Sequence, residues 1–219
     1  TAKIDLQGPE SLDVLEAVLD SSWRHLKYFN HETTSFFDSP LRVSRTGYTG
    51  ELGYELYLPA QNAVALWEAL VADERVKPVG LGARDTLRLE CGLPLYGQDL
   101  DEEHTPREAG YGFLLKKETP YVGKDGLEDV REKLVPLAVE GRRTPRHGDT
   151  VLGPGGDKVG DVTSGSFAPS LGHCVALAWV SAADADAETF RIQGARAQLD
   201  ARRVSLPFYT EGTARMKLE

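Results

Sequence analysis

The sequence predicts an α+β fold, in which a mixed α/β body precedes a C-terminal β-barrel. Up to residue 95, segments with helical periodicity alternate with segments in which every second residue is apolar. Beyond residue 128, short β-type segments are separated by turns at the spacing of about 8–12 residues that is typical of a barrel or sandwich. We therefore expect a first domain over residues 1–127 and a barrel domain over residues 128–219.

The first domain is predicted to begin with a strand over residues 3–7 and a helix over residues 9–20. Gly8 separates the two, and Pro9 suits the first turn of a helix because its fixed φ is already helical. Four apolar residues of this helix fall on one face, which predicts an amphipathic helix. They are Leu12, Leu15, Val18 and Leu19.

Residues 42–58 are predicted to form a β-hairpin with a long, ordered, glycine-rich loop. Side chains alternate in its second arm, residues 54–58, so Leu56 and the two residues that share its face should enter the core. Glu55 is then expected to project from the opposite face, next to the loop that carries Tyr48.

The remaining elements follow from the same patterns. Helices are predicted over residues 61–73, 83–90 and 125–133, and in the first of them Val64, Trp67, Leu70 and Val71 are expected to be buried. Arg84 stands at the beginning of the second helix, where the macrodipole disfavours a cation, so either a partner outside the helix or an ion pair with Asp85 or Glu90 is expected. The barrel strands are predicted over residues 134–140, 159–163, 174–180, 189–192, 196–199 and 203–206.

Composition excludes several classes of protein. The 219 residues carry a formal charge of −9 without a basic tract, which argues against nucleic-acid binding. No run approaches the roughly 20 apolar residues of a membrane span, and the first residues do not resemble a signal peptide. Two cysteines cannot build a disulfide framework, which favours a reducing cytoplasm or organelle matrix, and of these we expect the cytoplasm. The histidines lack the spacing of a metal site, so we expect none.

Glu55 is the most informative candidate residue. A carboxylate fixed on a strand can accept two parallel N–H bonds from a planar, amidine-like edge such as that of a pterin or a guanine. The alternative is a strand glutamate that faces solvent and binds no ligand. The basic clusters at residues 142–146 and 202–203 are either solvated loop charges or a contact for an acidic partner or an anionic ligand tail.

Residues 45–56, Arg-Thr-Gly-Tyr-Thr-Gly-Glu-Leu-Gly-Tyr-Glu-Leu, resemble the signature hairpin of the glycine cleavage system T-protein (aminomethyltransferase) family. Four further blocks resemble the family in the same order: residues 5–9, 80–92, 95–99 and 159–171. The resemblance therefore covers essentially the whole chain.

The resemblance implies a T-protein-like α/β folate-binding body followed by a C-terminal β-barrel lobe. It implies a transferase of glycine catabolism that moves the one-carbon unit of a lipoyl-bound aminomethyl group to tetrahydrofolate, with release of ammonia. The lipoyl arm belongs to the carrier H-protein, which is the expected partner. By match to the family blocks, Glu55 pairs with the amino-pyrimidine edge of the pterin, and Arg84, Tyr48 and Tyr96 lie at the folate site.

One departure from the family pattern qualifies these expectations. The family's functional aspartate lies before the block at residues 5–9, so the catalytic residue is unknown in this chain, and we expect a chain that lacks the N-terminal section and is inactive alone. Two alternatives stay open: a tetrahydrofolate-dependent demethylase of a small methylated substrate, and a non-catalytic folate-binding paralogue.

Overall fold

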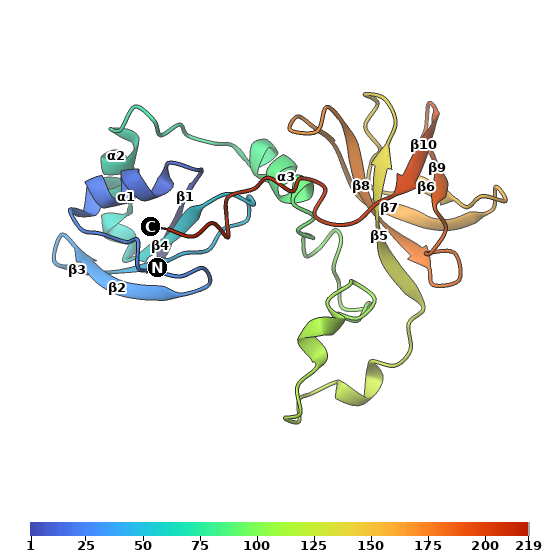
Figure 1. The fold of residues 1–219 in the computed structure, drawn as a ribbon, viewed down its shortest axis with the longest axis horizontal. Helices are drawn as coiled ribbons and strands as arrows, with labels where there is room; N and C mark the ends of the chain where they lie inside the picture. The colour runs from blue at the N-terminus through green and yellow to red at the C-terminus, as the bar shows by residue number, and fades with distance from the viewer. Residues whose placement is uncertain (219) are drawn as a thin grey trace. The chain divides into compact units, whose positions relative to one another are not determined.

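The computed structural model describes residues 1–218. It contains two compact units, one formed by residues 1–88 with the C-terminal residues from Thr210, and the other by residues 89–209. The first unit combines helices with an open sheet, and the second contains a closed barrel of six strands (Figure 1). The expected fold class, a mixed α/β body and a β-barrel, is confirmed.

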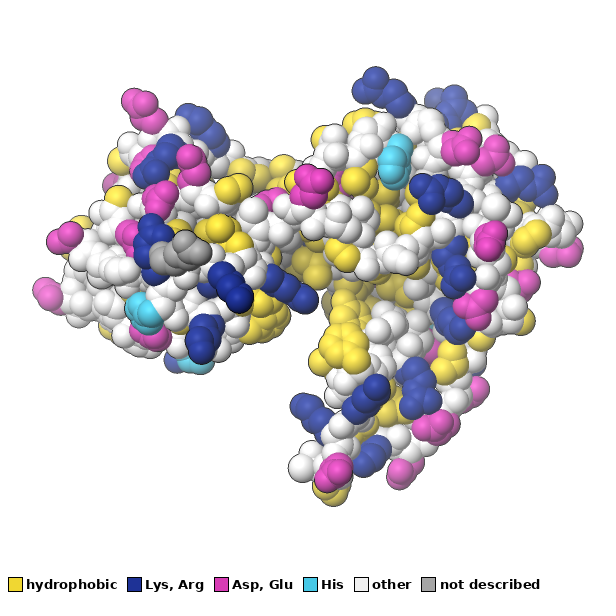
Figure 2. Space-filling view, in the orientation of Figure 1, with side chains coloured by type: hydrophobic (Ala, Val, Ile, Leu, Met, Phe, Trp, Pro, Cys, Tyr) yellow, Lys and Arg dark blue, Asp and Glu magenta, His cyan; other side chains and the backbone are white. Residues whose placement is uncertain are grey.

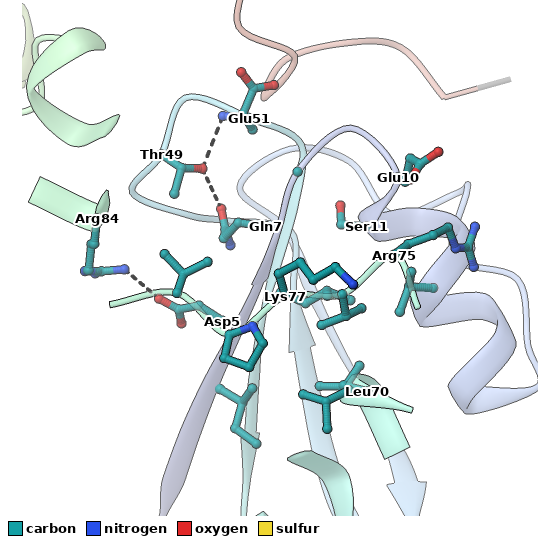
Figure 3. Close-up of a pocket in the computed structure, with 18 of the residues that line it drawn as sticks. Asp5, Gln7, Glu10, Ser11, Thr49, Glu51, Leu70, Arg75, Lys77 and Arg84 are labelled. Atoms are coloured by element: carbon teal, nitrogen blue, oxygen red, sulfur yellow. Dashed lines mark hydrogen bonds and ion pairs between the residues drawn. The ribbon is translucent and has the colours of Figure 1, made fainter. Parts of the chain in front are cut away.

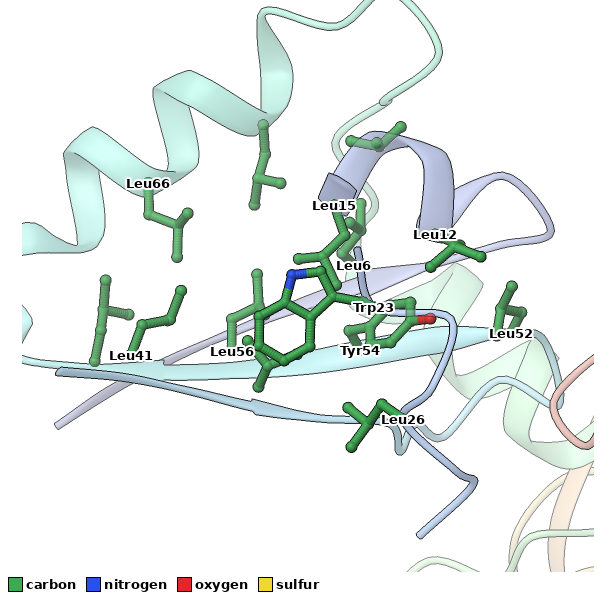
Figure 4. Packing of buried hydrophobic residues seen from close by; sticks show 14 residues of the cluster. Leu6, Leu12, Leu15, Trp23, Leu26, Leu41, Leu52, Tyr54, Leu56 and Leu66 are labelled. Atoms are coloured by element: carbon green, nitrogen blue, oxygen red, sulfur yellow. The ribbon is translucent and has the colours of Figure 1, made fainter. Parts of the chain in front are cut away.

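The first unit is built on a four-stranded antiparallel sheet in the order β1-β4-β3-β2. Its strands are β1 (Ala2–Gln7), β2 (His31–Phe36), β3 (Ser39–Ser44) and β4 (Gly53–Leu58). The helices are α1 (Ser11–Leu19), α2 (Ala63–Val71), which follows a short 3₁₀ turn at Ala60–Asn62, and α3 (Leu81–Glu90), which runs into the second unit. Helices α1 and α2 cover one face of the sheet, so the opposite face is left for polar side chains (Figures 1 and 4).

The core of the first unit lies between that sheet and the two helices. Tyr54 and Leu56 of β4 are fully buried, as the alternation predicts, and they share one hydrophobic cluster with Leu66 and Leu70 of α2. Figure 4 shows Leu66 reaching from the helix towards Leu41 of β3. The expected buried face of α2 is only partly right, because Val64 and Trp67 are 66% and 44% exposed. This helix has apolar side chains on nearly every side, so the periodicity of its sequence does not predict which side packs against the sheet.

The second unit is a closed antiparallel barrel in the order β10-β5-β8-β7-β6-β9. Its strands are β5 (Glu132–Val139), β6 (Thr150–Leu152), β7 (Lys158–Ala168), β8 (His173–Ser181), β9 (Thr189–Gln193) and β10 (Gln198–Arg203). The short β6 was not predicted, and the two strands expected over residues 196–199 and 203–206 are one strand, β10. Closure of the barrel pairs every one of these strands on both edges.

The helix expected over residues 125–133 is absent. Residues 125–126 belong to a 3₁₀ turn, Lys124–Gly126, and residues 132–133 already belong to β5. The connecting segment between α3 and β5, residues 91–131, contains one other short 3₁₀ turn, Gly112–Leu115. The buried Glu108 carboxylate accepts the backbone N–H of Arg131 at 2.9 Å, and the Glu108 carbonyl accepts that of Leu134 at 3.0 Å. These bonds hold the chain extended before β5, because a helix would need the same N–H groups for its own ladder.

The surface of each unit carries charges of both signs, interspersed over the face in view (Figure 2). No helix among residues 1–218 is long and apolar enough to cross a bilayer.

Candidate functional site

Glu55 lies on β4, on the face of the sheet opposite the core. Its side chain is 17% exposed, and Lys3 Nζ lies 2.6 Å from Oε1. The other oxygen, Oε2, accepts hydrogen bonds from the Thr46 hydroxyl and, at 3.1 Å, from the Tyr57 hydroxyl. Glu55 is therefore a half-buried carboxylate held by three donors rather than a solvated strand residue.

These donors keep the Glu55 carboxylate charged. Burial opposes the ionised form, but the hydrogen bonds from Lys3 and Thr46, the charge of Lys3 and the hydrogen bond from Tyr57 outweigh it, so the pKa of Glu55 lies below its ordinary value. An ionised carboxylate only accepts hydrogen bonds. Glu55 therefore presents a fixed acceptor at neutral pH.

A second carboxylate faces Glu55 across the sheet. Asp5 of β1 is its direct cross-strand partner, and like charges in that position destabilise a sheet unless cations intervene. Lys3 lies between them, with Nζ 3.0 Å from Asp5 Oδ1 as well as 2.6 Å from Glu55 Oε1. The Arg84 guanidinium lies 2.7 Å from Asp5 Oδ2. Two cations thus balance the two carboxylates.

Arg84 connects this pair to the hairpin loop. It projects from α3 to Asp5 on β1, so the expected alternative of an ion pair with Asp85 or Glu90 is wrong, and Asp85 instead pairs with Arg88 at 2.8 Å. The Arg84 guanidinium also lies 5.1 Å from the centroid of the Tyr48 ring, within the range of a cation–π contact. One connected set of side chains results, which we call the polar network: Lys3, Asp5, Tyr48, Glu55 and Arg84.

A cavity of about 780 Å³ runs along β1 (Figure 3), and three members of the polar network line it, whereas Tyr48 and Glu55 do not. Lys3, Asp5 and Arg84 line its polar part, together with Gln7 and Thr49. Its apolar part includes Leu70, Val71 and Val76. A volume of this size accommodates a small organic ligand, and apolar walls with a few fixed polar groups are typical of such sites.

The structure brings together three of the four folate-site residues expected from the sequence: Glu55, Arg84 and Tyr48. The fourth, Tyr96, belongs to the second unit, where its side chain is 65% exposed. Nearby, the buried Asp99 carboxylate accepts the Leu95 N–H at 2.9 Å and bonds the Thr163 hydroxyl of β7. Asp99 therefore fixes the turn that carries Tyr96.

Lys3 and Asp5 were not expected at the site from the sequence. The alternation of β1 could have predicted them. It places both residues on the face opposite Ile4 and Leu6, and this is the face of the sheet on which Glu55 of β4 lies. Among residues 1–218, no group of three or more histidine, cysteine or acidic side chains is placed to hold a metal ion. Cys91 and Cys174 do not form a disulfide.

Two family models match the chain. Residues 1–119 match the model described as the GCVT N-terminal domain, and residues 132–210 match the glycine cleavage T-protein C-terminal barrel domain. The second match falls on the barrel, whose strands span Glu132–Arg203.

Curated relatives and a solved structure agree with these models. The aminomethyltransferases of Thermotoga neapolitana and Saccharopolyspora erythraea are each 40% identical over 95% of this chain, which covers 59% and 60% of their lengths. The crystal structure of glycine cleavage system aminomethyltransferase T from Bartonella henselae matches with a TM-score of 0.88 and 31% identity, over 96% of this chain and 60% of that one. The chain therefore spans about 60% of the length of these proteins.

Proposed function

Because the chain belongs to the glycine cleavage T-protein family, we propose that it acts within a tetrahydrofolate-dependent aminomethyltransferase. The reaction would transfer the one-carbon unit of a lipoyl-bound aminomethyl group to tetrahydrofolate and release ammonia. The lipoyl carrier, the H-protein of the glycine cleavage system, would be the partner. Two cysteines that form no disulfide support a reducing compartment such as the cytoplasm.

The polar network is the observation that carries this proposal. The pterin of tetrahydrofolate presents an amino-pyrimidine edge with two N–H donors, which suits a charged, fixed carboxylate. Glu55 Oε1 accepts one bond, from Lys3, and a carboxylate oxygen can accept two, so one acceptor position remains there. A second N–H can reach Oε2 if the Tyr57 hydroxyl turns away, which gives up one hydrogen bond worth about 0.5–1.5 kcal/mol. The residues present therefore fit the ligand.

The other residues of the network would orient the ligand. Tyr48 offers an aromatic face, and Arg84 offers a positive charge to an anionic folate, which a chain of net charge −9 does not attract by its overall field. Tyr96 is proposed as a further folate-binding residue from its match to the family block. Bound tetrahydrofolate would supply the nitrogen atoms that receive the one-carbon unit. These residues of the chain would hold it in place, which is a large part of such catalysis.

A transfer assay tests the proposal. We would use a chimaera in which this chain is joined to the residues of the Thermotoga neapolitana relative that it does not span. Mixed with tetrahydrofolate and an aminomethylated lipoyl carrier, the chimaera should form methylenetetrahydrofolate and ammonia in equal amounts, with the complete relative as the positive control. Product from a small methylated amine, and none from the carrier, would indicate a demethylase instead. Tight folate binding without product from either donor would indicate a binding protein.

A further inference from the structure

The Gln7 side chain crosses the base of the hairpin loop over residues 45–52, between β3 and β4. Gln7 is the last residue of β1, and its amide Nε2 donates to the carbonyl of Thr46 at 3.2 Å and that of Tyr54 at 3.5 Å. Its Oε1 accepts the hydroxyl of Thr49 at 3.0 Å (Figure 3). One amide therefore contacts residues at the beginning, in the middle and just after the end of the loop.

Two glycines, Gly47 in the loop and Gly53 at the start of β4, make room for this amide. A Cβ at Gly47 would lie 2.0 Å from Gln7 Oε1, and one at Gly53 would lie 2.3 Å from the same atom. Neither glycine has a positive φ, so close approach of the amide, rather than a left-handed backbone, explains why no side chain fits there. The position of the Gln7 amide therefore requires glycine at both places.

Two residues that bond to Gln7, Thr46 and Thr49, lie on either side of Tyr48 in the sequence. Thr46 and Thr49 are both fixed by the amide, and the Tyr48 ring lies between them in the chain and against the Arg84 guanidinium. The far end of the loop has its own anchors, since the Leu52 carbonyl accepts the Gly8 N–H at 2.8 Å and the Ser11 hydroxyl at 3.0 Å. Loss of the amide should therefore loosen residues 46–49 while the rest of the loop stays attached.

We propose that Gln7 is a positioning residue of the ligand site, which acts by holding Tyr48 in place. The proposal rests on the proposed function, because it assigns Tyr48 to the wall of the folate site. Glutamine suits this place because it supplies donors to two carbonyls and an acceptor to a hydroxyl at once. A glutamate would put a carboxylate against the two carbonyls and lose both donations.

The variants Gln7→Met and Gln7→Glu test the proposal, with Gln61→Met as the control because Gln61 is exposed in the same unit. Methionine keeps the volume and removes every hydrogen bond. Hydrogen exchange followed by NMR should show faster exchange at the amides of residues 46–49 in both Gln7 variants, and no change at Leu58 or in the control. Unchanged exchange at residues 46–49 would overturn the proposal.

A double-mutant cycle with Tyr48→Ala separates positioning from general destabilisation. In the chimaera, Gln7→Met should weaken tetrahydrofolate binding about tenfold, and should have almost no further effect when Tyr48 is already alanine. An equal loss in both backgrounds would contradict action through Tyr48. If the parent chimaera binds no folate but the exchange at residues 46–49 still responds to Gln7→Met, the proposed function fails while the loop contact stands, so the two failures are distinguishable.

Discussion

Tyr54 of β4 combines full burial with a polar atom that has no hydrogen-bond partner among residues 1–218. Burial raises the pKa of its hydroxyl to about 12, so the group is neutral at any physiological pH. A buried hydroxyl without a partner costs about 1–3 kcal/mol of desolvation. The ring therefore stabilises the core, and its oxygen does not.

Replacing Tyr54 with Phe should leave the free energy of unfolding unchanged or raise it by up to about 3 kcal/mol, because only the unsatisfied hydroxyl is removed. Tyr57→Phe is the matched control on the same strand, since its hydroxyl donates to Glu55 at 3.1 Å, and it should lower the free energy of unfolding. Chemical denaturation measures both. A loss above about 1 kcal/mol in Tyr54→Phe would mean that its hydroxyl is satisfied.

At the scale of elements, His104 attaches the connecting segment to the barrel. Its ring stacks on Trp179 of β8 with centroids 3.8 Å apart, while Nδ1 lies 2.9 Å from Asp101 and Nε2 lies 3.0 Å from Glu132 of β5. Burial opposes the imidazolium, but the hydrogen bonds to Glu132 and Asp101 and their charges outweigh it, so the pKa of His104 lies above its ordinary value of 6.5.

The raised pKa predicts a pH-dependent contribution to stability. The charged imidazole stabilises the folded state, so its contribution is complete below pH 6.5 and is lost as the pH rises through the raised pKa. The free energy of unfolding of the wild type should therefore exceed that of His104→Gln most at about pH 5, and the difference should shrink towards about pH 9. Denaturation followed by tryptophan fluorescence measures it. A difference that is constant with pH would contradict the assignment.

Elements could be predicted from the sequence where neighbouring residues decide the structure. The alternation of residues 54–58 correctly gave the buried face of β4, whereas residues 125–133 were misread because Glu108, distant in sequence, binds their N–H groups. The three residues of β6 include a single fully buried one, Val151, which is too little pattern to recognise. The face of Glu55 was predictable for the same local reason.

At the scale of the whole molecule, the site depends on contacts between residues far apart in the sequence, which the spacing of neighbouring residues does not predict. Arg84 reaches Asp5, 79 residues away, and Lys3 reaches Glu55, 52 residues away, so these pairs follow only from the order of strands in the sheet. The family blocks pointed to Glu55, Arg84 and Tyr48 without showing how they are joined. The chain spans about 60% of its relatives' length, so the proposed activity is tested in the chimaera.

The central claim is that Glu55 accepts the pterin edge of tetrahydrofolate. Its most direct test is anaerobic calorimetry of tetrahydrofolate binding to the chimaera carrying Glu55→Gln, Lys3→Met or, as a control on the exposed face of α2, Glu68→Gln. Both Glu55→Gln and Lys3→Met break the same ion pair, but only the first removes the negative charge and replaces one acceptor oxygen of residue 55 with an NH2 donor.

Glu55→Gln should lose about 1.5–3 kcal/mol of binding free energy, or roughly 10- to 150-fold in affinity. Lys3→Met should bind at least as well as the parent, because it frees a lone pair of Oε1, and Glu68→Gln should match the parent. Unchanged affinity in Glu55→Gln, or equal losses in Glu55→Gln and Lys3→Met, would contradict the claim and leave Glu55 as a structural partner of Lys3.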